Sequence, residues 1–302
     1  MNTPLPRTIA EYLDQLRAAL RGADPALIQD ALYDAEDHLR SELSENPGKS
    51  EAEILAKIAN SYGAPDEVAA IYVDKELQVE QALRSPPPPP RSSALGRFFG
   101  VAADPRAYAA LFYMLLSLAT GIFYFTWAVT GISLSIGLSI LIFGIVFAVL
   151  FFGTVRVLSL VEGRIIEVML GERMPRRPLY ANTKKSWGGR VKDMFTDPRT
   201  WSTLFYMILM LPLGIIYFTI AVTGISVSLG LMAAPIAALL CNFGVIGGGI
   251  SWDREVFAPP MILAPVVFVV GVFLLFGMLH LARGIGRLQG ALAKHLLVMS
   301  AA

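Results

Sequence analysis

The chain contains 302 residues, of which 55% are hydrophobic and 16% are charged. A soluble domain carries about 25% charged residues, so this composition excludes an entirely soluble protein and indicates that part of the chain lies in a membrane. The single cysteine, Cys241, excludes an internal disulfide and a cysteine metal cluster.

The net charge of +1 conceals an uneven distribution along the chain. Residues 1–84 carry 8 Lys and Arg against 16 Asp and Glu, whereas residues 85–302 carry 17 against 8. An acidic head binds the phosphates of nucleic acid poorly, so we expect no direct contact with nucleic acid. It suits a basic protein surface, which includes the surface of a DNA-binding protein.

Residues 1–83 are predicted to form a small bundle of four helices. Thr8 and Ser50 each precede a glutamate at the spacing of a capping box. Asp24 precedes a proline, a pair that opens a helix, and the break at 62–65 precedes the fourth helix. Leucine, isoleucine and alanine recur at helical spacing between these signals, which predicts one buried face for each helix.

A candidate partner-binding face lies on the second of these helices. It consists of four consecutive or near-consecutive polar residues, Asp34, Glu36, Asp37 and His38. The alternative is an ordinary solvated helix face, which the same residues would also form.

The segments LDQLRAAL, DALYDAEDHLRSEL, GKSEAEI and YGAPDEVAAIYV follow one another over about residues 9–73. In this order they resemble the HAAS-type domain of bacterial membrane proteins. The resemblance implies a small cytoplasmic helical module, commonly encoded beside PadR-type winged-helix regulators. It also implies a role in signalling between a membrane protein and a transcription factor.

Residues 84–99 are predicted to be a linker, because five consecutive prolines favour a stiff polyproline II spacer. The membrane domain then occupies residues 100–302.

An internal repeat organises the membrane domain. Residues 104–138 and 197–231 align without a gap at an offset of 93, with 23 identities in 35 positions. Each copy is predicted to cross the membrane from the basic side and to turn at a shared T-G-I-S sequence. The predicted turn residues are Thr130, Gly131 and Ser133 in the first copy and Thr223, Gly224 and Ser226 in the second.

The first copy, taken as residues 104–175, is predicted to return through 134–152 and to end in an amphipathic helix at the membrane interface, over about 156–170. The second copy, taken as 197–297, is longer. Its tail aligns with the first copy at an offset of 123, which indicates an insertion of 30 residues.

That insertion contains a charged segment, Trp252, Asp253, Arg254 and Glu255, which is a candidate sensing loop on the outer side. The alternative is an interfacial tryptophan anchor beside solvated charges.

The number of crossings depends on the apolar but glycine-rich stretch 225–250. Five crossings would place the basic tail outside, against the positive-inside rule, so four crossings are preferred, with 225–250 re-entrant or packed near the outer face. We therefore predict an all-α protein whose membrane domain consists of two parallel repeats, with both termini in the cytoplasm of a bacterium.

The pattern LPLG, then YF, then VTGIS, then an interfacial helix with Gly-Arg, over about residues 100–297, resembles the "putative sensor" membrane domain often fused to bacterial histidine kinases. No kinase sequence follows it here. This resemblance implies a membrane-embedded sensor of the bacterial inner membrane.

Catalytic motifs are absent from the sequence. His38, His280 and His295 have no metal-ligand spacing, and no nucleotide loop or nucleophile motif occurs. We therefore expect no enzyme activity and no cofactor. The leading hypothesis is a signalling protein whose head binds a PadR-type regulator or another basic protein. The alternatives are a transporter-like or lipid-binding protein with a regulatory head, and a structural membrane protein; a homo-oligomer remains open.

Overall fold

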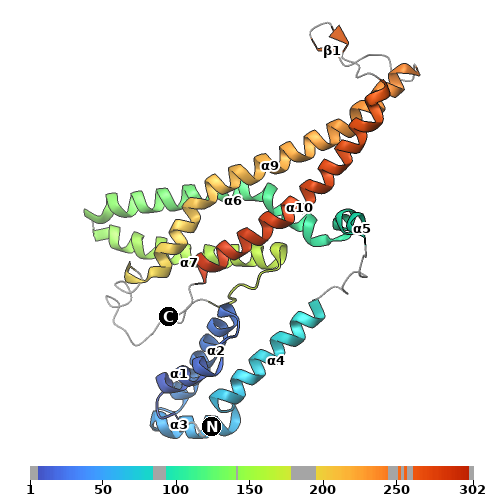
Figure 1. Cartoon of the computed structure of the whole chain (residues 1–302). Coiled ribbons are helices and arrows are strands. Elements are labelled where there is room, and N and C mark those ends of the chain that lie inside the picture. Colours follow the sequence, from blue (N-terminus) through green and yellow to red (C-terminus); the bar gives the residue numbers. More distant parts are fainter. Residues whose placement is uncertain are drawn as a thin grey trace.

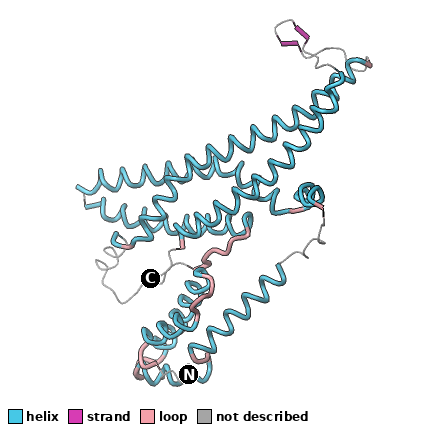
Figure 2. Tube along the Cα trace, viewed as in Figure 1, coloured by secondary structure: helices cyan, strands magenta, loops and turns pink. Residues whose placement is uncertain are grey.

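The computed structural model describes residues 6–83, 93–140, 142–177, 195–243, 251–252, 255–256 and 261–298. Helices make up almost all of this part, as predicted (Figures 1 and 2). Ser251–Trp252 (β1) and Glu255–Val256 (β2) form a short antiparallel strand pair. Most of the predicted linker, residues 84–92, lies outside the described residues.

The head is a four-helix bundle, α1 (Ile9–Ala19), α2 (Pro25–Glu45), α3 (Glu51–Ser61) and α4 (Pro65–Leu83). The predicted caps are present: the side chains of Thr8 and Asp24 accept backbone N–H groups of their helices, and Ser50 forms a full capping box. The core contains head residues alone, among them Tyr12, Leu16, Leu20, Ala31, Ala35, Leu39, Ile54, Leu55, Ile58, Val68 and Ala69. Ala26 of α2 is the exception, because it packs in the core cluster of the membrane domain.

Four helices of the described residues are long and apolar enough to cross a membrane, as preferred from the sequence. They are α6 (Pro105–Gly137), α7 (Ile142–Leu170), α9 (Pro198–Asn242) and α10 (Ala264–Leu297). The expected re-entrant segment after residue 225 is wrong, because α9 continues through that position as one helix of 45 residues. A continuous helix satisfies most of its backbone groups within itself in lipid, and the two internal prolines, each of which removes one N–H donor, do not end it.

The predicted T-G-I-S turns are also wrong. Thr130, Gly131 and Ser133 lie inside α6, and Thr223, Gly224 and Ser226 lie inside α9. The glycines serve packing instead, since a Cβ on Gly131 would overlap Phe151 of α7, and one on Gly224 would overlap Met278 of α10. In the first copy the chain reverses later, through the 3-10 turn Leu138–Ile140.

Residues 156–170 do not form a separate helix, because they continue α7 without a break. Its charged residues find partners inside the protein: Arg156 pairs with Asp197 and Arg164 with Glu167. A charged stripe therefore does not force this segment onto the membrane surface.

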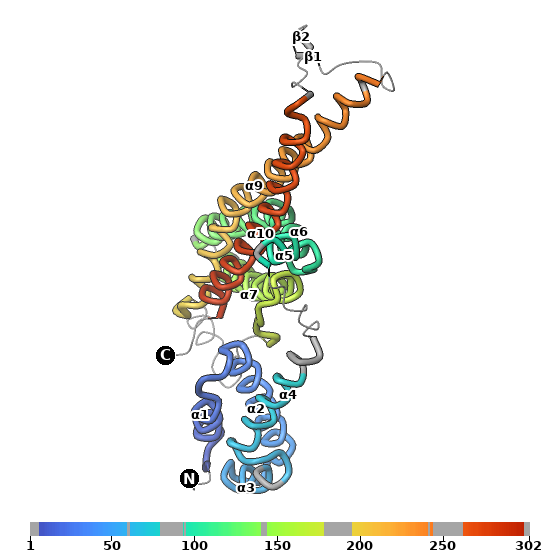
Figure 3. Tube along the Cα trace, turned by 45° about the vertical axis from the view of Figure 1, so that its right-hand side comes forward, coloured from blue at the N-terminus to red at the C-terminus, as the bar shows by residue number. Residues whose placement is uncertain are grey.

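The two hairpins, α6–α7 and α9–α10, cross where α6 meets α9 (Figure 1). A Cβ on Gly121 would strike the Met210 carbonyl, and one on Gly214 would strike the Ser117 carbonyl. The two contacts are equivalent under the repeat, because Gly121 and Gly214 are 93 positions apart and Ser117 and Met210 are also 93 positions apart. Equivalent glycines of the two copies thus let the two backbones touch, and beyond the crossing the hairpins diverge (Figure 3).

The chain enters the membrane domain through α5 (Ala94–Phe99) and the 3-10 turn Gly100–Ala103, which pack on α10. Phe98 stacks on His280, with 5.3 Å between ring centroids, and His280 Nε2 lies 3.0 Å from the Phe98 carbonyl oxygen. Phe99 packs against Phe273 and Phe276 of the same helix. The end of the linker is therefore fixed to the last helix.

Candidate functional site

The head and the membrane domain meet at a segment that we call the connector, residues 171–177. It leaves α7 through Gly171, whose φ of +75° lies in the left-handed region that favours glycine. Small residues of the membrane domain hold it: Met174 is fully buried against Gly163, and the Glu172 side chain lies over Gly290. The connector thus contacts helices from both hairpins.

Asp30 of α2 forms the central contact with the connector. Its Oδ1 accepts the backbone N–H groups of Arg176 at 2.7 Å and Arg177 at 2.9 Å, and its Oδ2 lies 3.3 Å from the Arg173 guanidinium. The Asp30 residue is only 6% exposed. Burial raises the pKa of this carboxyl, while the two backbone donors and the arginines oppose the rise.

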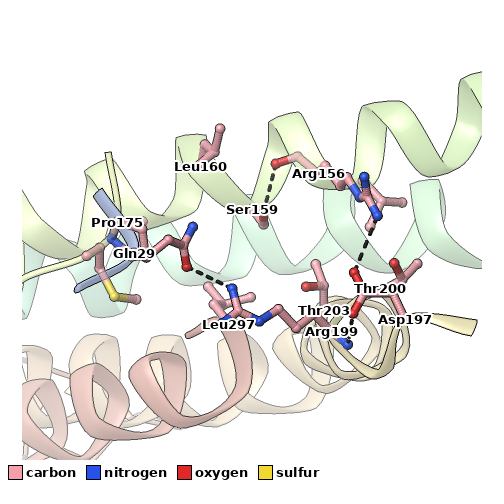
Figure 4. Close-up of a pocket in the computed structure, with 13 residues that line it drawn as sticks. Gln29, Arg156, Ser159, Leu160, Pro175, Asp197, Arg199, Thr200, Thr203 and Leu297 are labelled. Carbon is pink, nitrogen blue, oxygen red and sulfur yellow. Dashed lines mark hydrogen bonds and ion pairs between the residues drawn. The ribbon is translucent and has the colours of Figure 1, made fainter. Parts of the chain in front are cut away.

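Further polar contacts surround Asp30. Asp34 pairs with Arg177 at 3.1 Å and Asp24 pairs with Lys294 of α10 at 2.5 Å. Gln29 donates to the Arg177 carbonyl and accepts from the Arg199 guanidinium of α9, each at 2.8 Å (Figure 4). Glu76 of α4 pairs with Arg173. The acidic head therefore docks on the basic side of its own membrane domain.

A small pocket of about 60 Å³ lies beside this contact (Figure 4). Residues of α7, the connector, the start of α9 and the end of α10 line it together with Gln29 of the head. Thr200, in its wall, has a buried hydroxyl without a hydrogen-bond partner among the described residues. The pocket is small and mostly apolar, so it is a gap between packed elements rather than a site for a large ligand.

The four residues of the predicted partner face have different surroundings in the structure. Asp34 belongs to the docking contact, whereas Glu36 pairs with Arg40 one turn along α2. His38 stacks on Tyr62, with 4.4 Å between ring centroids, and Asp37 is exposed. The sequence analysis did not predict that Asp24, Gln29, Asp30 and Glu76 take part in the docking contact. The available signal was the opposite charge of the head and the membrane domain.

A buried polar cluster, also missed, lies where α6, α7, α9 and α10 meet. Glu162 of α7, 2% exposed, accepts hydrogen bonds from the hydroxyls of Tyr113, Tyr124 and Tyr206, each at 2.9 Å. Gln289 of α10, fully buried, donates to the Tyr113 and Tyr206 hydroxyls and accepts from that of Tyr217. The available signal was that two tyrosines of the first copy, Tyr113 and Tyr124, recur 93 positions later as Tyr206 and Tyr217 within an apolar span.

Equivalent contacts place α7 and α10 at an offset of 127, not 123. Glu162 and Gln289 are 127 positions apart and bind the same tyrosine hydroxyls. Phe151 and Met278 are also 127 positions apart, and they pack on the equivalent glycines Gly131 and Gly224. The ion pairs Arg156–Asp197 and Arg283–Asp104 follow the same rule. The insertion in the second copy is therefore 34 residues long, one helical turn more than the sequence alignment indicated.

The candidate sensing loop lies at the far end of the α9–α10 hairpin from the head (Figure 1). Trp252 pairs with Glu255 through the backbone in the β1–β2 ladder. Asp253 and Arg254 lie outside the described residues. The sensing role of this loop stays a prediction.

Among the described residues, no group of three or more His, Cys, Asp or Glu side chains is arranged to hold a metal ion. The fold and the junction define a multi-pass helical membrane protein with a helical head docked on one side.

Comparison with known families identifies both parts. The family model described as "Putative sensor" matches residues 113–297, more than half of the chain, so the protein belongs to this family. The HAAS model matches residues 11–71. Both matches agree with the resemblances seen in the sequence. No curated protein and no solved structure matches the chain.

Proposed function

We propose that this protein transmits the state of its membrane domain to a cytoplasmic transcription regulator of the PadR type, which binds the head. A sensor-family membrane domain joined to a HAAS head fits a membrane signalling protein. In this proposal the protein lies in the bacterial inner membrane with both termini in the cytoplasm. Both modules are regulatory, and the proposed role involves no catalysis.

The observation that carries the proposal is the contact of one helix, α2, with both repeats. Through Asp30 and Asp34 it binds the connector, which follows the first hairpin, and through Gln29 and Asp24 it binds Arg199 and Lys294 of the second. A movement of one hairpin relative to the other therefore alters the contacts of α2. The stimulus would act on the outer side, for which the loop 252–255 is the candidate.

Affinity capture tests the proposal. The full chain, solubilised from the membranes of its native host, is compared with a version that lacks residues 1–84. We expect a winged-helix regulator to be enriched with the full chain and lost with the truncated one. Equal recovery with both versions, or no regulator with either, would contradict the proposal.

A further inference from the structure

We propose that the surface of α2 that docks on the connector is also the surface through which the head binds its partner, so that docking and partner binding exclude each other. This inference rests on the proposed function. We call this surface the docking face; it consists of Asp24, Gln29, Asp30 and Asp34. The partner it fits is a basic protein segment that presents arginine side chains and two adjacent free backbone N–H groups, as the connector does.

The geometry around Asp30 favours recognition of a peptide backbone rather than of charge alone. One carboxylate oxygen accepts two successive backbone N–H groups, from Arg176 and Arg177, while the other faces the Arg173 guanidinium. Hydrogen bonds to a charged acceptor are stronger than hydrogen bonds between neutral groups. Any basic segment in a similar irregular conformation can supply the same three groups.

The charge of the face selects the class of partner. Three of its four residues are acidic, and their present partners are Arg173, Arg177 and Lys294. An anionic lipid surface or a nucleic acid would be repelled by these carboxylates. A basic protein segment is therefore the occupant that the docking face fits.

One contact of the docked state is exposed to solvent, and a competing segment can start to displace the connector there. In the Asp34–Arg177 pair the side chains are 35% and 55% exposed. An ion pair with this exposure is screened by solvent and contributes little to the docked state. The head also keeps its own core on leaving the connector, because that core contains head residues alone. Undocking therefore exposes a formed surface rather than an unfolded one.

The direct test uses the full chain in lipid nanodiscs and a labelled peptide of residues 170–177 (LGERMPRR) as the probe. In a membrane-side variant, Arg173→Ala with Arg177→Ala and Lys294→Ala, the ion pairs of the docking face are removed and docking is weakened, while α2 stays intact. We expect this variant to bind the peptide at least about tenfold more tightly than the wild type does. A second variant with only Arg177→Ala and Lys294→Ala, whose side chains are more exposed, covers the case in which loss of the half-buried Arg173 impairs folding.

Three controls examine the site itself. Asp30→Ala added to the membrane-side variant should abolish peptide binding, whereas Asp37→Ala, an exposed acidic residue on the same helix, should leave it unchanged. A peptide N-methylated at the backbone nitrogens that correspond to Arg176 and Arg177 keeps its charge but lacks the two backbone N–H donors, so it should not bind. Equal binding to wild type and membrane-side variant, or binding that survives both Asp30→Ala and N-methylation, would overturn the inference.

The same variants separate this inference from the proposed function. The membrane-side variant should capture more of the winged-helix regulator than the wild type, and Asp30→Ala should capture less. Equal capture by all three would overturn the shared surface and leave the proposed function standing. If none captures a regulator, the proposed function fails, and the peptide assay still reports whether the docking face accepts a basic segment.

Discussion

Glu162 of α7 and Gln289 of α10 occupy equivalent positions in the two hairpins and share the hydroxyls of Tyr113 and Tyr206 between them. The donors and acceptors alternate: both tyrosines donate to the carboxylate and accept from the amide. Each residue also binds a tyrosine of its own repeat, Tyr124 or Tyr217. The cluster therefore joins the hairpins through a fully paired network, in which one acidic side chain breaks the symmetry.

Glu162→Ala should destabilise the membrane domain strongly, because three buried tyrosine hydroxyls lose their acceptor together. We expect a loss of about 3 kcal/mol or more in the free energy of unfolding. Thermal unfolding of the detergent-solubilised chain measures it. Glu162→Gln should keep most of the stability, because it reproduces the side chain found at Gln289. Val168→Ala, at a position 80% exposed on the same helix, is the control and should change little.

The crossing of α6 and α9 predicts a second set of substitutions. Gly121→Ala and Gly214→Ala each place a Cβ against a backbone carbonyl of the other helix, so the helices must separate. Overpacking of this kind costs about 1–3 kcal/mol. Gly137→Ala and Gly230→Ala are matched controls, also 93 positions apart and with open space around the added Cβ. They should be neutral or slightly stabilising, and an equal effect at all four glycines would contradict the close crossing.

Docking of the head predicts slow hydrogen exchange at the backbone amides of Arg176 and Arg177. Asp30→Ala removes the acceptor of both amides and should accelerate their exchange at least about tenfold. Asp30→Asn keeps an oxygen acceptor, so it should retain part of the protection. Fast exchange in the wild type itself would show that the docked state is not the populated one.

The docking contact should also depend on pH. Because burial raises the pKa of Asp30, the docked state holds a proton more tightly than the undocked state does. The proton-linked part of the Asp30 contribution to docking is therefore fully present below the ordinary aspartate pKa of about 3.9 and is lost as the pH rises through the raised value, whereas the hydrogen bonds that the carboxylate accepts remain. Protection factors of the two amides, measured from pH 4 to pH 8 and compared with Asp30→Asn to cancel the other carboxylates, should fall with rising pH only in the wild type.

The sequence by itself determined the number and class of the parts. Apolar length, because about 20 residues must cross the hydrocarbon, left four or five spans, and the positive-inside rule favoured four. Capping residues such as Thr8 and Ser50 set the starts of the head helices. These signals are local, so they can be read without knowing what each helix touches. The family resemblances rest on the same local patterns.

Tertiary structure decided where the helices end and which polar residues matter. T-G-I-S resembles a turn in sequence, yet Gly131 and Gly224 are required by helices that return alongside α6 and α9. Glu162 fits a charged interfacial stripe, yet three tyrosines from two other helices surround it. In the sequence nothing distinguishes Asp30 from the other acidic residues of the head, whereas in the structure it accepts two backbone N–H groups of the connector. In each case the deciding contact is long-range, and a one-dimensional pattern does not contain the identity of a neighbour that only folding brings near.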